Sequence, residues 1–267
     1  SIVGGADAAA FVIVGDQLRL GTTAADYEQQ QSLEVTVRAT DTRNGSTDRT
    51  FTIAVEDSEE TTLTDGPDIV EPSEDDTQVL ATFATLSSDD SLDAGGGFDE
   101  LVLLGNGNID FRSLSLFANF ELIRMVNLSN SRSTLTLPIG ASTDVEVTGP
   151  GQTDIYLLGS TSVANITGGD GNEFIYLYND SSAEYIDLGN GSDTVYLNNN
   201  SAVGTIDTGS GYDRVYAYSS SQVGEITGTG GGIIQFSGSN AWNPDIEISG
   251  PFQLNLSVSS TPYDLTS

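Results

Sequence analysis

Carboxylate side chains recur at a fixed spacing in the second half of this 267-residue chain. Glu173, Asp193 and Asp213 lie 20 residues apart, and each follows a glycine-rich bend. Three copies of one pattern, ITGGDGNEFIYL, IDLGNGSDTVYL and IDTGSGYDRVYA, begin at Ile166, Ile186 and Ile206. A short fixed repeat predicts a solenoid, in which each repeat is one coil that buries its apolar side chains only against its neighbours.

Stacked parallel coils would bring equivalent carboxylates to roughly 4.8 Å from one another. At that distance two unit charges repel by about 0.9 kcal/mol in water and about 3.5 kcal/mol at an effective dielectric constant of about 20. The column is therefore expected to hold a divalent cation between its members. The alternative is a metal-free solenoid whose Gly-Asn and Gly-Asp turns serve only the backbone.

The glycine pattern resembles the Ca²⁺-binding repeats-in-toxin β-roll, whose unit is G-G-x-G-x-D-x-U-x. The matching segments are Gly168–Glu173, Gly189–Asp193 and Gly209–Asp213, with a looser match at Gly95–Asp99. The resemblance implies Ca²⁺ as the bound ion, with ligands at Asp99, Asp170, Glu173, Asp193 and Asp213. The family has two glycine motifs per coil of about 18 residues. Here there is one per 20 residues, so one row of ions is expected instead of two.

Tyrosines form a second column at the same spacing, at Tyr156, Tyr176, Tyr196 and Tyr216. Val195 and Leu197 flank Tyr196, so strand alternation predicts that the tyrosine points outward while its neighbours are buried. We interpret the column as a ladder that stabilises the sheet. The alternatives are a lateral contact between chains and a surface that binds glycan rings.

Residues 1–60 are not repetitive, and their short alternating strands and tight turns predict part of a β-sandwich. The predicted strands are Phe11–Val14, Gln17–Leu20, Leu33–Ala39 and Phe51–Val55. Hairpin turns are predicted at Gly15-Asp16 and Asn44-Gly45.

Three motifs in this part, ADYE from Ala25, ATD from Ala39 and VEDSEE from Val55, resemble a bacterial cadherin-like repeat. Carboxylates are hard oxygen donors that suit Ca²⁺. The resemblance implies Ca²⁺ ligands at the domain junction, namely Asp26, Glu28, Asp41, Asp57 and Glu60. The alternative is an acidic loop end without a metal. Glu59 replaces the family's linker asparagine, and the first strands of the sandwich are missing.

Half a sandwich would expose an unpaired strand edge and an open core. We therefore expect another chain, or another part of a longer parent, to supply the absent strand. Residues 251–267 alternate apolar and polar side chains like a donor strand, and head-to-tail donation would build an open filament. A truncated domain boundary is the alternative.

The predicted fold is all-β, with a partial cadherin-like sandwich followed by a parallel β-solenoid of about 20 residues per coil. The predicted order is the sandwich over 1–60, an acidic linker and N-terminal cap over 61–90, the solenoid over 91–250 and a C-terminal strand over 251–267.

Composition narrows the range of partners. The chain has 39 acidic and 8 basic residues and a net charge of -31, which argues against nucleic acid and anionic membranes. It has no cysteine or histidine, which excludes disulfides and zinc sites built on those residues. No apolar run approaches the ~18 residues of a membrane span. No signal peptide opens the sequence, so its export signal is expected elsewhere.

These observations favour a calcium-associated structural or adhesive protein, secreted or on the surface of a bacterium. It would be a subunit of a filament or surface layer that self-associates head to tail, or a segment of a large repeat adhesin. The alternative is a module that binds glycan, peptide, ice or another cell-surface ligand through the tyrosine column. An enzyme acting on polysaccharides is not expected, because no acid pair stands out from the periodic background.

Overall fold

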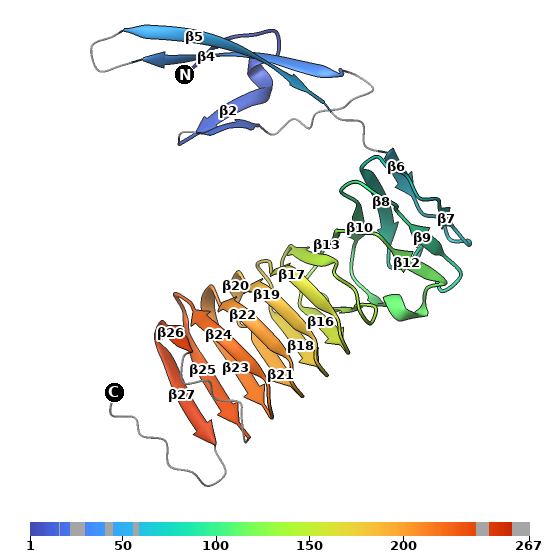
Figure 1. Ribbon diagram of the computed structural model, residues 1–267, viewed down its shortest axis with the longest axis vertical. Coiled ribbons are helices and arrows are strands. Elements are labelled where there is room, and N and C mark those ends of the chain that lie inside the picture. Colours follow the sequence, from blue (N-terminus) through green and yellow to red (C-terminus); the bar gives the residue numbers. More distant parts are fainter. Residues whose placement is uncertain (16, 22–29, 41–44, 56–58, 239–245, 258–267) are drawn as a thin grey trace. The chain divides into compact units, whose positions relative to one another are not determined.

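The computed structural model is almost entirely β-structure, which confirms the all-β prediction (Figure 1). It describes residues 1–15, 17–21, 30–40, 45–55, 59–238 and 246–257. The chain divides into two compact units, Ser1–Glu59 and Glu60–Ser267, and each is considered by itself below.

The N-terminal unit consists of a small antiparallel sheet and a hairpin. The sheet has the order β1-β4-β5, with β1 (Ile2–Gly4), β4 (Ser32–Thr40) and β5 (Ser46–Ala54). The hairpin pairs β2 (Phe11–Val14) with β3 (Gln17–Leu20) and follows the 3-10 turn η1 (Ala8–Ala10). The four strands predicted from alternation are therefore present, and both predicted pairings are antiparallel.

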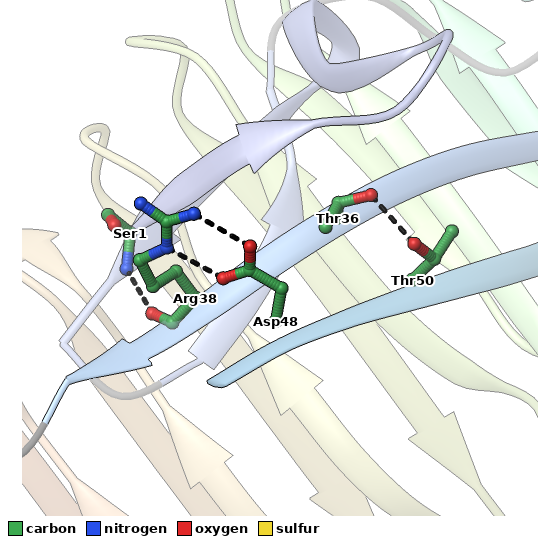
Figure 2. Close-up of polar contacts among 5 residues, drawn as sticks. All are labelled: Ser1, Thr36, Arg38, Asp48 and Thr50. Carbon is green, nitrogen blue, oxygen red and sulfur yellow. Dashed lines mark hydrogen bonds and ion pairs between the residues drawn. The ribbon is translucent and has the colours of Figure 1, made fainter. Parts of the chain in front are cut away.

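Cross-strand polar pairs hold β4 against β5 (Figure 2). The Arg38 guanidinium donates to both carboxylate oxygens of Asp48, at 2.6 and 2.7 Å, and the hydroxyls of Thr36 and Thr50 lie 2.8 Å apart. The N-terminal amine of Ser1 donates to the Arg38 carbonyl and ties down the start of β1. Beneath these contacts lies only a small core, formed by Phe11, Leu33 and Val35.

The second unit is a parallel β-solenoid of about nine turns with roughly 20 residues per turn. One side is a ten-stranded sheet, whose members in chain order are β6 (Glu59–Thr62), β8 (Thr77–Thr82), β10 (Glu100–Leu104), β13 (Leu122–Val126), β15 (Asp144–Thr148), β17 (Ser162–Thr167), β19 (Ser182–Asp187), β22 (Ala202–Asp207), β24 (Gln222–Thr227) and β26 (Glu247–Ser249).

The other side is a nine-stranded sheet, with β11 (Asn108–Asp110), β14 (Ser133–Thr136), β16 (Thr153–Leu158), β18 (Glu173–Tyr178), β20 (Asn190–Gly191), β21 (Thr194–Asn198), β23 (Ser210–Tyr218), β25 (Gly231–Ser237) and β27 (Phe252–Ser257). Near the start of the unit a third, three-stranded sheet contains β7 (Ile69–Val70), β9 (Ser91–Asp93) and β12 (Leu116–Ala118). The 3-10 turn η2 (Phe111–Ser113) lies in the same region.

The 20-residue spacing becomes the register of the solenoid. Tyr176 is paired with Tyr196, and Leu177 with Leu197, in the parallel pair β18–β21. Val195 and Leu197 are fully buried, whereas Tyr196 between them is only half-buried. The predicted inward and outward faces are therefore confirmed, and the inward side chains of the coils form one continuous apolar core.

The solenoid extends further at both ends than 91–250. Strand β8, within the predicted linker and cap, pairs in parallel with β10 and buries Val79 and Ala81 in the common core. Strand β27, within the predicted C-terminal strand, pairs in parallel with β25 as a solenoid strand instead of standing apart. The first coils repeat every 22 residues, as the link from Thr77 to Asp99 shows, so a 20-residue period does not detect them.

Candidate functional site

The bend at the start of the nine-stranded sheet, which includes β20 and the first residues of β23, requires glycine because successive coils touch there. Gly191 and Gly211 both have φ +133°, and a Cβ atom on Gly191 would lie 1.8 Å from the Gly171 carbonyl oxygen. On Gly211 it would lie 1.5 Å from the Gly191 carbonyl oxygen. A side chain would therefore collide with the backbone of the preceding coil, which explains why glycine recurs at this point of each repeat.

Immediately after this bend, Glu173, Asp193 and Asp213 form a column of buried carboxyl groups. Their exposed fractions are 0%, 0% and 1%. The backbone N–H of Glu173 donates to Asp193 Oδ1 at 2.8 Å, and the N–H of Asp193 donates to Asp213 Oδ1 at 3.0 Å. Each aspartate thus fastens its own coil to the coil before it, a role that the sequence did not predict.

The other carboxyl oxygens of this column are left unpaired. Asp193 Oδ2, Asp213 Oδ2 and both carboxyl oxygens of Glu173 have no hydrogen-bond partner of good geometry among the described residues. The buried hydroxyl of Thr208 lies beside Asp213 and is likewise without such a partner in that part of the chain. Because unpaired buried oxygens are costly, the column needs protons or a cation.

The coil that contains Glu173 accommodates a longer acidic side chain than the next two coils, because a smaller residue, Gly168, lies beside it. A Cβ atom on Gly168 would lie 3.0 Å from Glu173 Oε2. The equivalent positions in the next two coils are Leu188 and Thr208, and there the acid is the shorter aspartate. The absence of a side chain at position 168 therefore makes room for the extra methylene of glutamate.

Burial disfavours ionisation of these groups. It raises the pKa of Glu173 to about 8, with a further contribution from the charge of Asp193. It also raises the pKa of Asp193 to about 8, although the N–H of Glu173 opposes the shift, and the charge of Asp213 adds to it. The pKa of Asp213 is raised by burial too, and the N–H of Asp193, the hydroxyl of Thr208 and the charge of Arg214 partly offset that effect. At neutral pH without a cation, protonated carboxyls are therefore favoured.

Asp99 does not join this column. It precedes β10 of the ten-stranded sheet, where its Oδ1 accepts the N–H of Thr77 at 2.7 Å and its own N–H donates to Glu121 Oε2 at 2.8 Å. In the first coils the glycine motif lies at the bend that leads into the ten-stranded sheet, whereas in the later coils it lies at the bend that leads into the nine-stranded sheet. Motif spacing alone therefore misplaces Asp99. Glu121 was missed, and its position 22 residues after Asp99 is the signal that could have found it.

The remaining predicted ligands are dispersed or not described. Asp170 is exposed, and its Oδ1 accepts a hydrogen bond from the Asn190 amide at 2.8 Å. Among the described residues, no three acidic side chains converge on a point that could hold a metal ion. Outside the described part of the chain lie the side chain of Glu60 and the residues Asp26, Glu28, Asp41 and Asp57.

The structure brings the four predicted tyrosines together as an outward ladder. The ring centroids of Tyr156 and Tyr176 are 4.5 Å apart, and the two following steps to Tyr196 and Tyr216 are 5.1 Å each. Neighbouring rings are nearly parallel, with interplanar angles of 15° or less. The rings therefore cover one another's faces, and their edges and hydroxyls are left for solvent or a partner.

The N-terminal unit has an open apolar groove of about 300 Å³, lined by Ile13, Leu18, Val37, Phe51 and Ile53. Phe51 and Ile53 are each 37% exposed, and every residue of β5 is exposed. Among the described strands, β5 pairs only with β4 and forms an edge of its sheet. This arrangement has the features expected of an incomplete sandwich.

Comparisons with known proteins leave the family of this chain open. No protein-family model matches it, and no curated protein or solved structure is significantly similar. The cadherin-like and repeats-in-toxin resemblances therefore remain interpretations of short motifs. In the described part of the chain, no helix has the length and apolar character needed to cross a membrane.

Proposed function

We propose that this chain is a calcium-associated structural or adhesive segment of a protein on a bacterial surface, within a filament, a surface layer or a large repeat adhesin. The observation that carries the proposal is the column of buried carboxyl groups formed by Glu173, Asp193 and Asp213. Such a column is unfavourable when charged, and an external cation would compensate it. A solenoid that stiffens when it meets Ca²⁺ outside the cell suits a mechanical role.

The oxygen donors of the bend suit Ca²⁺ chemically, since carboxylates and hydroxyls are hard ligands. Asp193 and Asp213 would hold the ion together with the Thr208 hydroxyl, because these side chains carry buried oxygens without partners among the described residues. Bound Ca²⁺ would supply the positive charge that the column lacks. Because the ligands come from neighbouring coils, binding would couple those coils to each other.

Assembly by strand addition is the second part of the proposal. The groove bordered by Phe51 and Ile53 is apolar and lies beside the exposed edge of β5. An extended strand from another chain, or from elsewhere in a longer parent, would pair with the free backbone groups of β5 and bury these side chains. Since β27 belongs to the solenoid, residues 252–257 are a poor candidate for that donor strand.

The alternative function, glycan binding by the tyrosine column, has weaker support. A sugar ring stacks on an aromatic face, but the rings of Tyr176 and Tyr196 lie against their neighbours at about 5 Å on both sides. Only ring edges and hydroxyls face outward along most of the column. Its geometry favours a ladder that stabilises the sheet, or a contact with another protein surface.

The test is thermal unfolding of the whole chain with and without Ca²⁺. At about 100 times the dissociation constant, binding to the folded state adds about 2.7 kcal/mol. For a unit of this size that is a rise of about 5–11 °C in Tm. The double substitution Asp193→Asn and Asp213→Asn is expected to abolish the rise. The matched control, Glu184→Gln, removes a carboxylate from an exposed position and is expected to retain it.

A wild-type Tm that Ca²⁺ does not change would contradict the calcium part of the proposal. Electron microscopy of the same samples tests assembly. Filaments or sheets are expected from the wild type, and their head-to-tail growth should be lost when Phe51→Glu places a charge in the groove. Single particles under all conditions would contradict assembly of this chain by strand addition.

A further inference from the structure

The outward face formed by the later strands of the nine-stranded sheet has few charged side chains. Along β16, β18, β21, β23, β25 and β27, the described outward positions hold only two charged side chains, Asp154 and Arg214, and Arg132 pairs with Asp154. The centre of this aromatic face is formed by Tyr156, Tyr176, Tyr178, Tyr196, Tyr216 and Tyr218. In a chain of net charge -31, such a surface is an exception.

The opposite side of the same coils has the reverse character. The outward face of β19, β22, β24 and β26 contains no lysine or arginine among its described residues. Tyr185, which is 38% exposed, and its neighbour Thr205 also lie on this acidic face. Its charged side chains are Glu184, Asp187, Asp207, Glu225 and Glu247.

We infer that the aromatic face docks on the acidic face of a second copy of this chain. This inference rests on the proposed role in a layer or filament and names the lateral contact within it. Tyrosine and arginine are the side chains enriched at the centres of protein interfaces. The tyrosines repeat once per coil, and the carboxylate pairs Asp187–Asp207 and Glu225–Glu247 have the same spacing, so tyrosine hydroxyls can meet carboxylates of the second copy.

The stacking of the rings favours this partner over an apolar one. Since the ring faces cover each other, the aromatic face presents mainly hydroxyl groups, which donate hydrogen bonds to carboxylates. The pKa of Tyr176 is raised to about 12 by burial and by the nearby charge of Asp154, so its hydroxyl keeps its proton. Arg214 adds a positive charge at one end of the face, where it also lies over the Tyr212 ring.

The size of the face indicates a weak contact that gains from repetition. Six strands at about 4.8 Å and strands of about 20 Å give roughly 570 Å² per copy. The total of about 1,100 Å² is at the low end for specific interfaces. Because the two faces differ, each bound copy leaves one face free, and association continues in one direction. Net repulsion between acidic copies must be screened, so association is expected near 0.15 M salt, where the Debye length is about 8 Å.

Two complementary variants of the whole chain test the inference in sedimentation experiments at that ionic strength. Tyr178→Glu with Tyr218→Glu blocks the aromatic face but leaves the continuous ladder in place. Glu184→Arg with Glu225→Arg reverses the charge of the acidic face. Both variants are made in a chain that also has Phe51→Glu, so that strand addition does not contribute. With both faces intact, this chain is expected to form open-ended oligomers that grow with concentration, and each face variant alone is expected to stay monomeric. An equimolar mixture should stop at dimers, since only one pair of intact faces remains.

Other outcomes would overturn the inference. If the acidic-face variant alone still dimerises, two aromatic faces contact each other. If the wild type stays monomeric, the two faces do not bind each other and would serve a different ligand.

Circular dichroism checks folding, and Arg214→Glu is a milder aromatic-face variant expected to weaken association at least tenfold. Leu128→Ser, at a 71% exposed loop position, is the matched control and should associate like wild type.

Strand addition is distinguished by Phe51→Glu, which lies in the N-terminal unit. If the face variants abolish lateral growth and Phe51→Glu does not, the docking surface is supported even where strand addition fails. If only Phe51→Glu abolishes association, strand addition stands and the docking of the two faces is refuted.

Discussion

Replacement of Asp193 by asparagine removes one ionisable group from the middle of the buried column while keeping its shape. The asparagine carbonyl can still accept the N–H of Glu173, which Asp193 Oδ1 accepts at 2.8 Å in the wild type. What changes is proton binding. In the unfolded chain this carboxyl titrates near its ordinary pKa of 3.8, whereas burial raises its pKa in the folded chain to about 8.

The folded wild type therefore retains a proton that the unfolded chain releases, so stability must fall as the pH rises from about 4 to about 8. One extra bound proton corresponds to about 1.4 kcal/mol per pH unit, and the full shift is on the order of 5 kcal/mol. Glu173 contributes in the same direction, since burial raises its pKa to about 8. The expected slope for wild type without divalent ions is about 2–3 kcal/mol per pH unit.

Asp193→Asn is expected to lose at least half of that slope, because it removes one proton and also the charge that acts on Glu173. Thermal unfolding in a chelator, followed by circular dichroism across this pH range, measures the effect. Each extra proton that the folded state binds corresponds to a decrease of about 3–6 °C in Tm for every pH unit by which the pH is raised. Glu184→Gln is the matched control, since Glu184 is exposed and does not act on the column, and should keep the wild-type slope. Wild-type stability that is flat or rises across this range would refute the reasoning.

Three further substitutions probe the coil itself. Gly191→Ala places a Cβ atom 1.8 Å from the Gly171 carbonyl oxygen and should cost about 2–4 kcal/mol in chemical unfolding. Gly105→Ala, which meets no atom within 4 Å, should cost clearly less, and equal losses would contradict the collision. Tyr196→Ala removes two ring contacts and should lower the free energy of unfolding by about 1–3 kcal/mol, whereas Tyr196→Phe should retain most of it. Leu197→Ala should cost about 2–5 kcal/mol in the same assay, and a loss below 1 kcal/mol would argue against its place in the core.

The repeat was the part of the fold that the sequence predicted best. Identical residues 20 apart, such as Tyr176 and Tyr196, became directly paired because a solenoid converts a sequence period into strand register. Residues 61–90, which contain β8 of the first coil, were assigned to a linker and cap because the spacing to the next coil is 22 residues and the apolar positions are less regular. The last strand was misread for a similar reason, since alternation in Phe252–Ser257 shows a strand but not its partner.

The site was predicted in its residues but not in its chemistry. The spacing showed that Glu173, Asp193 and Asp213 would stack, yet it carried no sign that all three are buried and that the two aspartates accept backbone N–H groups. Side-chain direction at a bend depends on glycine φ angles that the sequence only suggests. Asp99 was grouped with the column because the same glycine motif occurs at both bends of the coil. Only the order of the strands in the two sheets distinguishes one bend from the other.

The most direct test of the account is the carbon-13 chemical shift of the Asp193 side-chain carboxyl, followed by NMR as the pH is raised in a chelator. A buried column that depends on protons or a cation predicts that this carboxyl is still protonated at neutral pH and ionises near pH 8. Ionisation near its ordinary pKa of 3.8, in the absence of any divalent ion, would contradict the central claim.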